Sequence, residues 1–407
     1  MRPVNKIGPL TGVRVIEMGQ LIAGPFCGKL FAEFGAEVIK IEPPATADNP
    51  GGDPIRAWRK LHEGTSLWWY LQSRNKKSVT VNLRAEEGQE IIRKLVATSD
   101  ILIENFRPGA LENWGLGWEQ LAAINPKLIM VRLSGYGQTG PYKDRPGFGS
   151  IAEAMGGMRY VTGYADRPPV RVGVSLGDAI AAMYGAIGAL MALHHRNANG
   201  GKGQIVDVAL YEAVFSLMES MLPEFAMTGF VRERTGSSLP GIVPSNTYTT
   251  KDGKFVVIGA NGDSIFKRFM RAIDRADLAE DPTLETNAGR VIRTDELERI
   301  IANWCAANDL EPVLKTLADA DVPSGSIYNI EDIVKDVHFK SRDMVQTFKL
   351  SGDQDISLPG IVPKLSDTPG NTAWLGPKLG EHNSEVLNGL GYSDEQQTQL
   401  RDKGVIG

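Results

Sequence analysis

The stretch "VRVIEMGQLIAGPFCGKLFAEFGAEVIKIE" (residues 13–42) decides the fold of this chain. Its apolar spacing predicts a strand, a glycine-punctuated loop, a helix and a second strand over 13–18, 19–25, 26–35 and 36–42. Gly35 ends the helix, and Pro43-Pro44 ends the second strand. A strand–helix–strand unit of this kind implies two parallel strands joined by a right-handed crossover. The chain therefore opens an α/β fold.

The alternation of strands and helices continues beyond this unit. Strands are predicted over 78–83, 100–106 and 127–137, with helices over 85–99 and 110–124 between them. This order is typical of a Rossmann-like, doubly wound α/β domain. Gly19, Gly24 and Gly28 have the spacing G-x4-G-x3-G and not G-x-G-x-x-G, so we reject nicotinamide binding.

The second half of the chain changes character after residue 222. A hairpin is predicted over 247–260 with Asp252-Gly253 at its turn, and helical patterns follow over 264–275, 293–308 and 310–320. We therefore expect a large domain over 1–222, a smaller α+β domain over 225–325, and a segment over 326–407 that returns to the large domain.

Composition limits the classes of function. The net charge of −5 argues against bulk nucleic-acid binding. The longest apolar run, 179–193, is too short to span a bilayer and is predicted to be a core helix. The N-terminus has no apolar signal segment, and two cysteines and five scattered histidines suggest neither a disulfide framework nor a metal site. We expect a cytoplasmic protein with no membrane partner.

Six motifs, in order along nearly the whole chain, resemble the family III coenzyme A transferases, the group of formyl-CoA transferase and the carnitine CoA-transferases. They are "PLTGVRVIEMGQLIAGPFCGKLFAEFGAEVIKIEPP" (9–44), "SRNKKSVTVNL" (73–83), "ILIENFRPGALENWGL" (101–116), "INPKLIMVRLSGYGQTGP" (124–141), "GVSLGD" (173–178) and "LGEHNSEVL" (379–387). The resemblance implies a homodimer of interlocked, ring-shaped subunits. It also implies an enzyme with no tightly bound cofactor that takes CoA thioesters and small carboxylic acids as substrates.

The resemblance makes Asp178, the last residue of "GVSLGD", the candidate nucleophile. A carboxylate that attacks an acyl-CoA thioester gives a mixed anhydride, and the CoA thiolate then converts it to an aspartyl thioester. With an ordinary pKa near 3.9, an aspartate needs no base to ionise it at neutral pH, and a helix N-terminus favours the anion. An aspartate before an apolar helix is also a favoured N-cap, so a structural role for Asp178 stays open.

The resemblance implies that CoA is bound by the first strand–helix loop and by two other strand ends. The matching positions here are Ile22, Ala23, Val81, Arg84, Asn105, Phe106 and Arg107, with Phe148 against the acyl or pantetheine portion. Three cationic positions of formyl-CoA transferase are Pro43, Asn113 and Pro146 in this chain. Other cations must then hold the CoA phosphates, and the candidates are Lys40, Arg74, Lys76 and Arg107.

Two alternatives share this fold. A 2-methylacyl-CoA racemase needs a histidine where this chain has Phe148, and phenylalanine carries no proton, so racemisation would require a distant residue such as His62. A CoA-binding protein without catalysis is the third reading. Among transferase substrates, Arg171 is suited to the distal carboxylate of a dicarboxylic acyl group such as succinyl, or equally to a structural ion pair.

Overall fold

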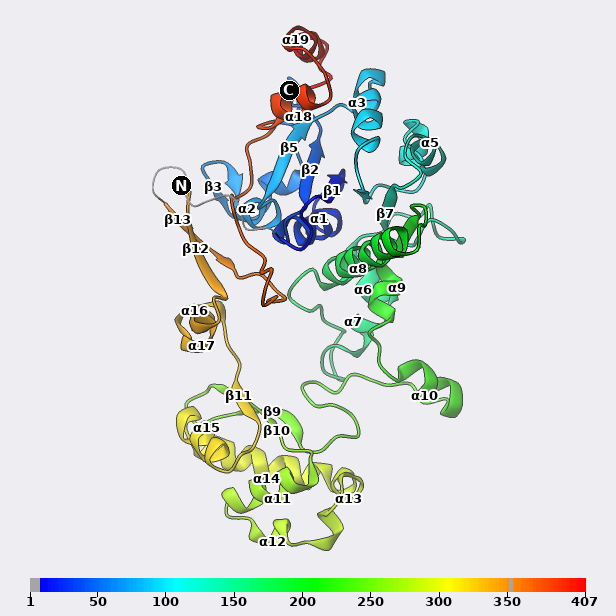
Figure 1. Ribbon diagram of the computed structural model, residues 1–407. Helices are drawn as coiled ribbons and strands as arrows, with labels where there is room; N and C mark the ends of the chain where they lie inside the picture. Colours follow the sequence, from blue (N-terminus) through cyan, green and yellow to red (C-terminus); the bar gives the residue numbers. More distant parts are fainter. Residues whose placement is uncertain (1–7, 351–353) are drawn as a thin grey trace. The chain divides into compact units, whose positions relative to one another are not determined.

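The computed structural model describes residues 8–350 and 354–407, which form two compact units (Figure 1). The first unit runs up to Arg159 and includes Arg171–Glu219 and Thr347–Gly407; the second consists of Tyr160–Val170 and Ser220–Gln346. The second unit is thus larger than the predicted 225–325, because 160–170 and 326–346 belong to it. Residues 1–7, the start of the predicted first domain, lie outside the described residues.

A six-stranded parallel sheet forms the centre of the first unit. The strand order reads 3-2-1-4-5-6 when these six strands are counted along the chain, which is the Rossmann order. Successive strands are added first on one side of the first strand and then on its other side, so the order reverses between the two central strands. The loops that follow these two strands therefore diverge. From edge to edge the strands are β5 (Lys76–Thr80), β2 (Glu37–Glu42), β1 (Arg14–Glu17), β6 (Ile101–Glu104), β7 (Ile129–Ser134) and β8 (Ile205–Ala209).

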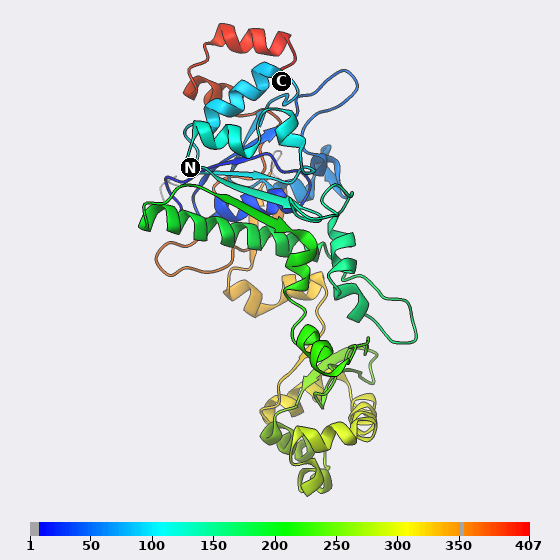
Figure 2. The same ribbon diagram turned by 90° about the vertical axis from the view of Figure 1, so that its right-hand side faces the viewer.

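Helices cover both faces of this sheet, as the doubly wound prediction requires (Figure 2). On one face α1 (Ala23–Glu33) and α8 (Leu176–Ala198) pack on residues such as Val15 and Val131. On the other face, residues such as Ile16 and Ile41 are covered by α3 (Glu86–Val96), α4 (Ala110–Asn113), α5 (Trp118–Ile124), α18 (Asn383–Gly389) and α19 (Asp394–Asp402).

The single helix predicted over 110–124 is wrong, because the chain forms α4 and α5 with a break between them. Gly115 adopts a φ of 63°, in the left-handed region that ends helices. The N–H of Leu116 then donates to the carbonyl of Leu111 at 2.8 Å, which closes α4. The apolar spacing continues across the break, so periodicity alone could not reveal it.

The predicted core helix is α8, which extends beyond 179–193 at both ends. Among the described residues it is the one helix long and apolar enough to cross a membrane by length and composition alone. Half of that apolar stretch is buried, and its small residues, Ala182, Ala186 and Ala189 among them, lie against α1 and the sheet. With this buried face, α8 is a core helix of the first unit.

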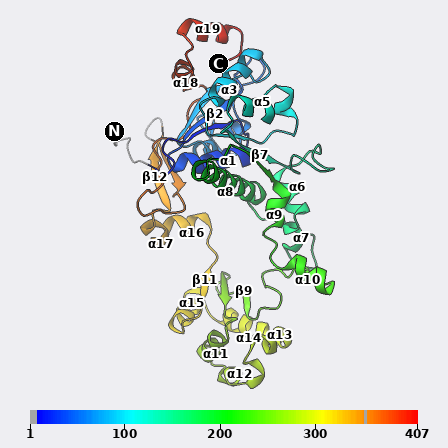
Figure 3. The ribbon, with the colours of Figure 1, turned by 45° about the vertical axis from the view of Figure 1, so that its right-hand side comes forward.

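The second unit has its own core, built on a small antiparallel sheet of order β11-β10-β9 (Figure 3). The predicted hairpin is confirmed: Val256 pairs with Tyr248, and Gly253 sits at the turn with a φ of 73°. The elements are β9 (Ser245–Thr249), β10 (Phe255–Gly259), β11 (Ser324–Ser326), α11 (Asp263–Ala272), α12 (Ala276–Ala279), η2 (Pro282–Leu284), α13 (Asn287–Ile292), α14 (Thr294–Ala307) and α15 (Leu310–Asp319).

Short elements connect these parts of the chain. They are η1 (Pro54–Ala57), β3 (Leu61–His62), β4 (Thr65–Ser66), α2 (Leu67–Gln72), α6 (Gly149–Met155), α7 (Met158–Val161), α9 (Leu210–Phe215), α10 (Met221–Thr228), α16 (Ile330–Lys335), α17 (Val337–Ser341), β12 (Val345–Lys349) and β13 (Asp355–Pro359). The pair α16 and α17 follows the predicted end of the small domain and belongs to the second unit. These two helices have no buried residues.

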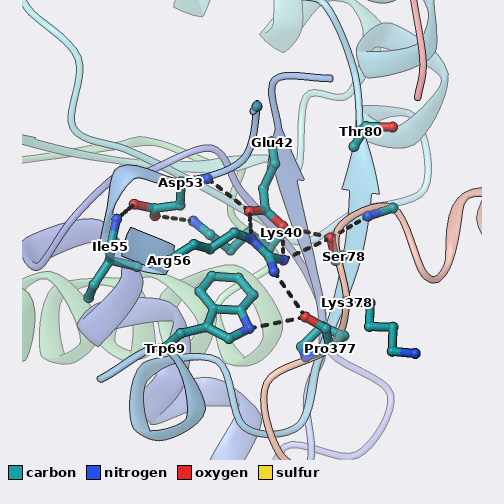
Figure 4. Close-up of polar contacts among 12 residues, drawn as sticks. Lys40, Glu42, Asp53, Ile55, Arg56, Trp69, Ser78, Thr80, Pro377 and Lys378 are labelled. Atoms are coloured by element: carbon teal, nitrogen blue, oxygen red, sulfur yellow. Dashed lines mark hydrogen bonds and ion pairs between the residues drawn. The ribbon is translucent and has the colours of Figure 1, made fainter. Parts of the chain in front are cut away.

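The C-terminal segment is fastened to the edge of the large sheet by hydrogen bonds. The indole of the buried Trp69 donates to the carbonyl of Pro377 at 3.0 Å, and the N–H of His382 donates to the carbonyl of Ser78 at 3.0 Å. Figure 4 shows Arg56 beside this contact, stacked over the Trp69 ring at 3.6 Å and paired with Glu42. The segment therefore completes the first unit.

Candidate active site

A pocket of about 640 Å³ opens in the first unit at the point where the sheet order reverses. Its walls include the loop after β1 (Gln20–Ala23) and the loop after β6 (Asn105–Pro108). In doubly wound sheets, ligands bind at the carboxyl ends of the strands beside this reversal. The position of the pocket is therefore the one that the topology favours.

The structure brings most of the predicted site residues to this pocket. Those that line it are Ile22, Ala23, Asn105, Phe106, Arg107, Phe148 and Asp178. Val81 and Arg84 are not among its lining residues. The Val81 side chain is only 1% exposed and packs in the core beneath α3, and Arg84 is exposed outside the pocket. A position next to a strand end in the sequence is therefore not enough to place Val81 or Arg84 in the pocket.

Asn105 holds the loop after β1 in place. Its Oδ1 accepts a hydrogen bond from the N–H of Gln20 at 2.8 Å, and its Nδ2 donates to the carbonyl of the same residue at 2.9 Å. Leu21 follows with a φ of 63°, which is costly for a leucine and must be imposed by its surroundings. The Asn105 amide thus positions the pocket wall.

A cluster of buried charges lies beneath that loop, and we call its members Glu17, Lys40, Asp53 and Lys76 the charge cluster. The Nζ of Lys40 lies 2.8 Å from Glu17, 2.9 Å from Asp53 and 2.7 Å from the Gly19 carbonyl. Asp53 also accepts from the N–H of Leu21 at 2.9 Å. Figure 4 shows the contact between Lys40 and Asp53. Burial disfavours the ammonium, but Asp53, Glu17 and Glu42 together outweigh it and raise the pKa of Lys40.

The burial of Lys40, Arg74 and Lys76 corrects the expectation that one of these residues holds CoA. Each of these side chains is at most 1% exposed. Arg74 donates from its Nε to Glu33 at 2.7 Å, and Lys76 pairs with Glu17 and donates to the Pro25 carbonyl at 2.7 Å. Buried, paired cations cannot reach a ligand, so all three stabilise the fold instead.

Asp178 lies in the first turn of α8, which begins at Leu176, so Asp178 is not the N-cap that precedes the helix. Its carboxylate reaches toward Gly149 at the start of α6. A Cβ atom placed on Gly149 would lie 2.0 Å from Oδ2 of Asp178, so a larger residue there would displace this carboxylate. Asp178 is partly exposed and lines the pocket. It is therefore accessible from the pocket.

The surroundings of Asp178 make its carboxylate more basic than usual. Burial is the largest cause, and the nearby negative charge of Glu153 is the second; together they raise the pKa of Asp178 to about 6. The positive charge of Arg171 opposes them. The carboxylate is therefore still mostly ionised at neutral pH, although less completely than the sequence indicated.

The pocket is positively charged. Five cationic side chains line it, against one carboxylate, Asp178, among the described lining residues: Arg59, Arg107, Lys143, Arg145 and Arg171. Sequence reasoning missed Arg59, Lys143 and Arg145 as pocket residues, because they lie in loops whose course no periodic pattern predicts. Such a surface suits an anionic ligand such as the phosphates of CoA.

Other reactive groups offer less. Cys27 and Cys305 are buried, and burial raises the pKa of both thiols, so neither forms a thiolate nucleophile readily. The part of the chain that the structure describes contains no group of three or more side chains suited to a metal ion. No histidine lies among the described lining residues of the pocket, and Phe148, where the resemblance would put the racemase histidine, is one of those lining residues.

Comparison with known proteins agrees with this geometry. Residues 10–383 match the model of CoA-transferase family III. The chain is 49% identical over 400 residues to the succinyl-CoA–D-citramalate CoA-transferase of Chloroflexus aurantiacus, covering 98% of each chain. It is 43% identical over 403 residues to the beta subunit of the succinyl-CoA–L-malate CoA-transferase of the same organism, again covering 98% of each chain.

A crystal structure of a CAIB/BAIF family protein from Brucella suis has the same fold, with a TM-score of 0.82 at 32% identity over 95% of this chain and all of that one. This chain belongs to CoA-transferase family III. It is an enzyme that transfers coenzyme A, with CoA thioesters as co-substrates.

The raised pKa of Asp178 predicts the pH dependence of the enzyme. If only the ionised carboxylate attacks, kcat/KM for the acyl-CoA donor should be halved near pH 6 and fall to about a tenth by pH 5. Glu153→Gln keeps an acceptor for the Gly177 N–H but removes the negative charge, so it should move the midpoint to lower pH. Rates measured from pH 4.5 to 8.5 test both expectations.

Glu112→Gln is the matched control, because Glu112 pairs with Arg132 and does not act on Asp178. It should leave the midpoint unchanged. A parent midpoint near pH 4, or an equal shift in both variants, would contradict the assigned electrostatics.

The charge cluster predicts a large effect of a single buried lysine on stability. Lys40→Met removes the ion pair of Lys40 with Asp53 and its ion pair with Glu17, and leaves Glu17 paired with Lys76. It should therefore lower the free energy of unfolding by about 3–5 kcal/mol. Lys403→Met removes an exposed pair with Glu87 and should leave the melting temperature nearly unchanged. Equal melting temperatures for the two variants would show that the cluster contributes little.

Proposed function

We propose that this enzyme transfers CoA from a dicarboxylic acyl-CoA, with succinyl-CoA as the donor, to a second dicarboxylic acid. Asp178 is the nucleophile that carries the acyl group and then CoA. The observation that carries this proposal is an accessible carboxylate, with a pKa of about 6, in a pocket whose other charged lining residues are cationic.

The reaction proceeds in exchanges at the Asp178 carboxyl group. One carboxylate oxygen attacks the thioester carbonyl, the C–S bond breaks, and CoA leaves as a thiolate to give a mixed anhydride. The thiolate attacks the Asp178 carbonyl, and the donor acid leaves as a carboxylate. The acceptor carboxylate then attacks the aspartyl thioester, which expels the thiolate and forms a second mixed anhydride. The thiolate attacks the acceptor carbonyl of that anhydride, and Asp178 leaves as a free carboxylate. Every bond broken is replaced, so neither a metal nor a redox step is needed.

The dicarboxylate class is supported by the relatives and by the charge of the pocket. The two relatives described above are named for succinyl-CoA with D-citramalate and with L-malate. A pocket with five lining cations suits substrates that keep one free carboxylate while the other reacts.

Substitution of the nucleophile tests the proposal. Asp178→Asn should lower turnover at least about a thousandfold, since an amide oxygen does not form the anhydride. Trapping the parent with hydroxylamine after incubation with succinyl-CoA should leave a hydroxamate on Asp178, detectable by mass spectrometry of peptides. Asp207→Asn, which changes an aspartate outside the pocket lining, should retain turnover and the Asp178 adduct.

Turnover in folded Asp178→Asn, or an adduct on another residue, would overturn the role of Asp178. A panel of donors and acceptors tests the substrate class separately. Acetyl-CoA as a better donor than succinyl-CoA, or butyrate as a better acceptor than citramalate and malate, would overturn the dicarboxylate assignment.

We also propose that the enzyme is a homodimer in which a second copy covers the outer face of α8. The inner face of α8 packs on the sheet, whereas a stripe on its other side is 38–67% exposed and apolar: Met183, Tyr184, Ile187, Leu190 and Met191. Their spacing places them on one side of the helix. The resemblance to interlocked dimers makes a second copy the partner of this face.

Charge on this stripe should separate the subunits. Ile187→Asp with Met191→Lys should convert a particle of twice the chain mass to one of the chain mass in light scattering coupled to size exclusion. Ile124→Asp, at the end of α5 on the opposite side of the sheet, is the control and should leave the mass unchanged. A parent of single-chain mass would contradict the dimer.

A further inference from the structure

Arg171 is anchored at one side of its guanidinium group. Its Nε donates to Oε2 of Glu153 at 3.2 Å, and Glu153 is only 2% exposed. The other oxygen of Glu153 accepts from the N–H of Gly177 at 3.3 Å, so this carboxylate is fixed to the first turn of α8. The buried Glu153 carboxylate, which accepts hydrogen bonds from both Arg171 and the Gly177 N–H, therefore sets the direction of the Arg171 side chain.

The opposite edge of the same guanidinium is available. Nη2 has only long contacts, 3.5 Å to the Val174 carbonyl and 3.4 Å to Oγ of Ser175. Nη1 has no hydrogen-bond partner among the described residues, and the Arg171 side chain remains 43% exposed where it lines the pocket. Two terminal nitrogens side by side match the two oxygens of a carboxylate.

Arg171 is also the pocket cation whose charge acts on Asp178. Its positive charge opposes the rise of the Asp178 pKa. Arg145 instead stacks on Tyr142 at 3.6 Å, and Arg59 lies over Trp68 at 5.5 Å. Arg171 is therefore placed to meet a group close to the reacting carbonyl.

The charge of Arg171 is not cancelled by Glu153. The same oxygen, Oε2, also lies 3.4 Å from Nη2 of Arg159, so one carboxylate is shared between two guanidinium groups. Arg159 does not line the pocket. The excess positive charge is accordingly presented on the pocket side, by Arg171.

We propose that Arg171 binds the carboxylate of a dicarboxylic substrate that does not receive CoA. Glu153 is the positioning residue that aims it. This inference rests on the proposed function, and it gives the dicarboxylate preference a physical cause. A substrate without the second carboxylate cannot make this paired, charge-assisted contact, and sites built to bond such a group discriminate against analogues that lack it.

Succinyl-CoA and butyryl-CoA separate this role from a structural one, because their acyl groups have four carbons and differ in the distal carboxylate. Arg171→Met should lower kcat/KM for succinyl-CoA about a hundredfold more than kcat/KM for butyryl-CoA. The measurements are made at pH 8.5, where Asp178 is ionised even if its pKa rises on loss of the arginine. Arg171→Lys should recover part of the succinyl-CoA rate, since it keeps the charge without the paired nitrogens.

Arg159→Met is the matched control, because Arg159 pairs with the same Glu153 oxygen outside the pocket. It should leave the ratio of the two donors as in the parent. Equal losses for both donors in Arg171→Met, or the same change of ratio in Arg159→Met, would overturn the role of Arg171 while leaving the transferase intact. A parent that forms no Asp178 adduct with either donor would overturn the proposed function itself.

Discussion

A lysine without exposed surface holds the central loop of this enzyme. Lys40 joins Glu17, Asp53 and the Gly19 carbonyl, and through Asp53 it also fixes the strained backbone at Leu21. Taking four charges out of water is costly, and it is offset only when each group is paired with good geometry. The pocket wall between β1 and α1 depends on this pairing, and with it the approach of any substrate to α8.

The groups around Asp178 have opposing effects on the pKa of its carboxyl group. Burial and Glu153 make the carboxylate more basic, which favours attack on a thioester, whereas Arg171 keeps it ionised near neutral pH. Glu153 takes part in both effects, because it repels the Asp178 charge and anchors the arginine that compensates for it. The site thus works as one set of coupled charges rather than as a single reactive side chain.

The sequence predicted the elements with a strong repeating pattern and the residues that family motifs mark. Five of the six strands of the large sheet and the hairpin with Gly253 agree with the structure, whereas β8 was not predicted; Ile22, Phe148 and Asp178 line the pocket. What failed was the reading of basic residues. Lys76 and Arg107 are alike as residues in a sequence, yet one is buried in an ion pair and the other lines the pocket. Burial of this kind depends on partners far away in the chain, as Glu17 is from Lys76, and single-sequence patterns do not contain it.

Gly149 shows how a residue with no functional group can shape a reactive site. The space that even a methyl would take is filled by an oxygen of Asp178. In a library of random variants, larger residues at this position should be selected against because they displace the Asp178 carboxylate, although Gly149 takes no part in bond making. Sensitivity to substitution at Gly149 would reflect the space that the Asp178 carboxylate needs. A search for catalytic residues that relied on such sensitivity alone would select a residue that does no chemistry.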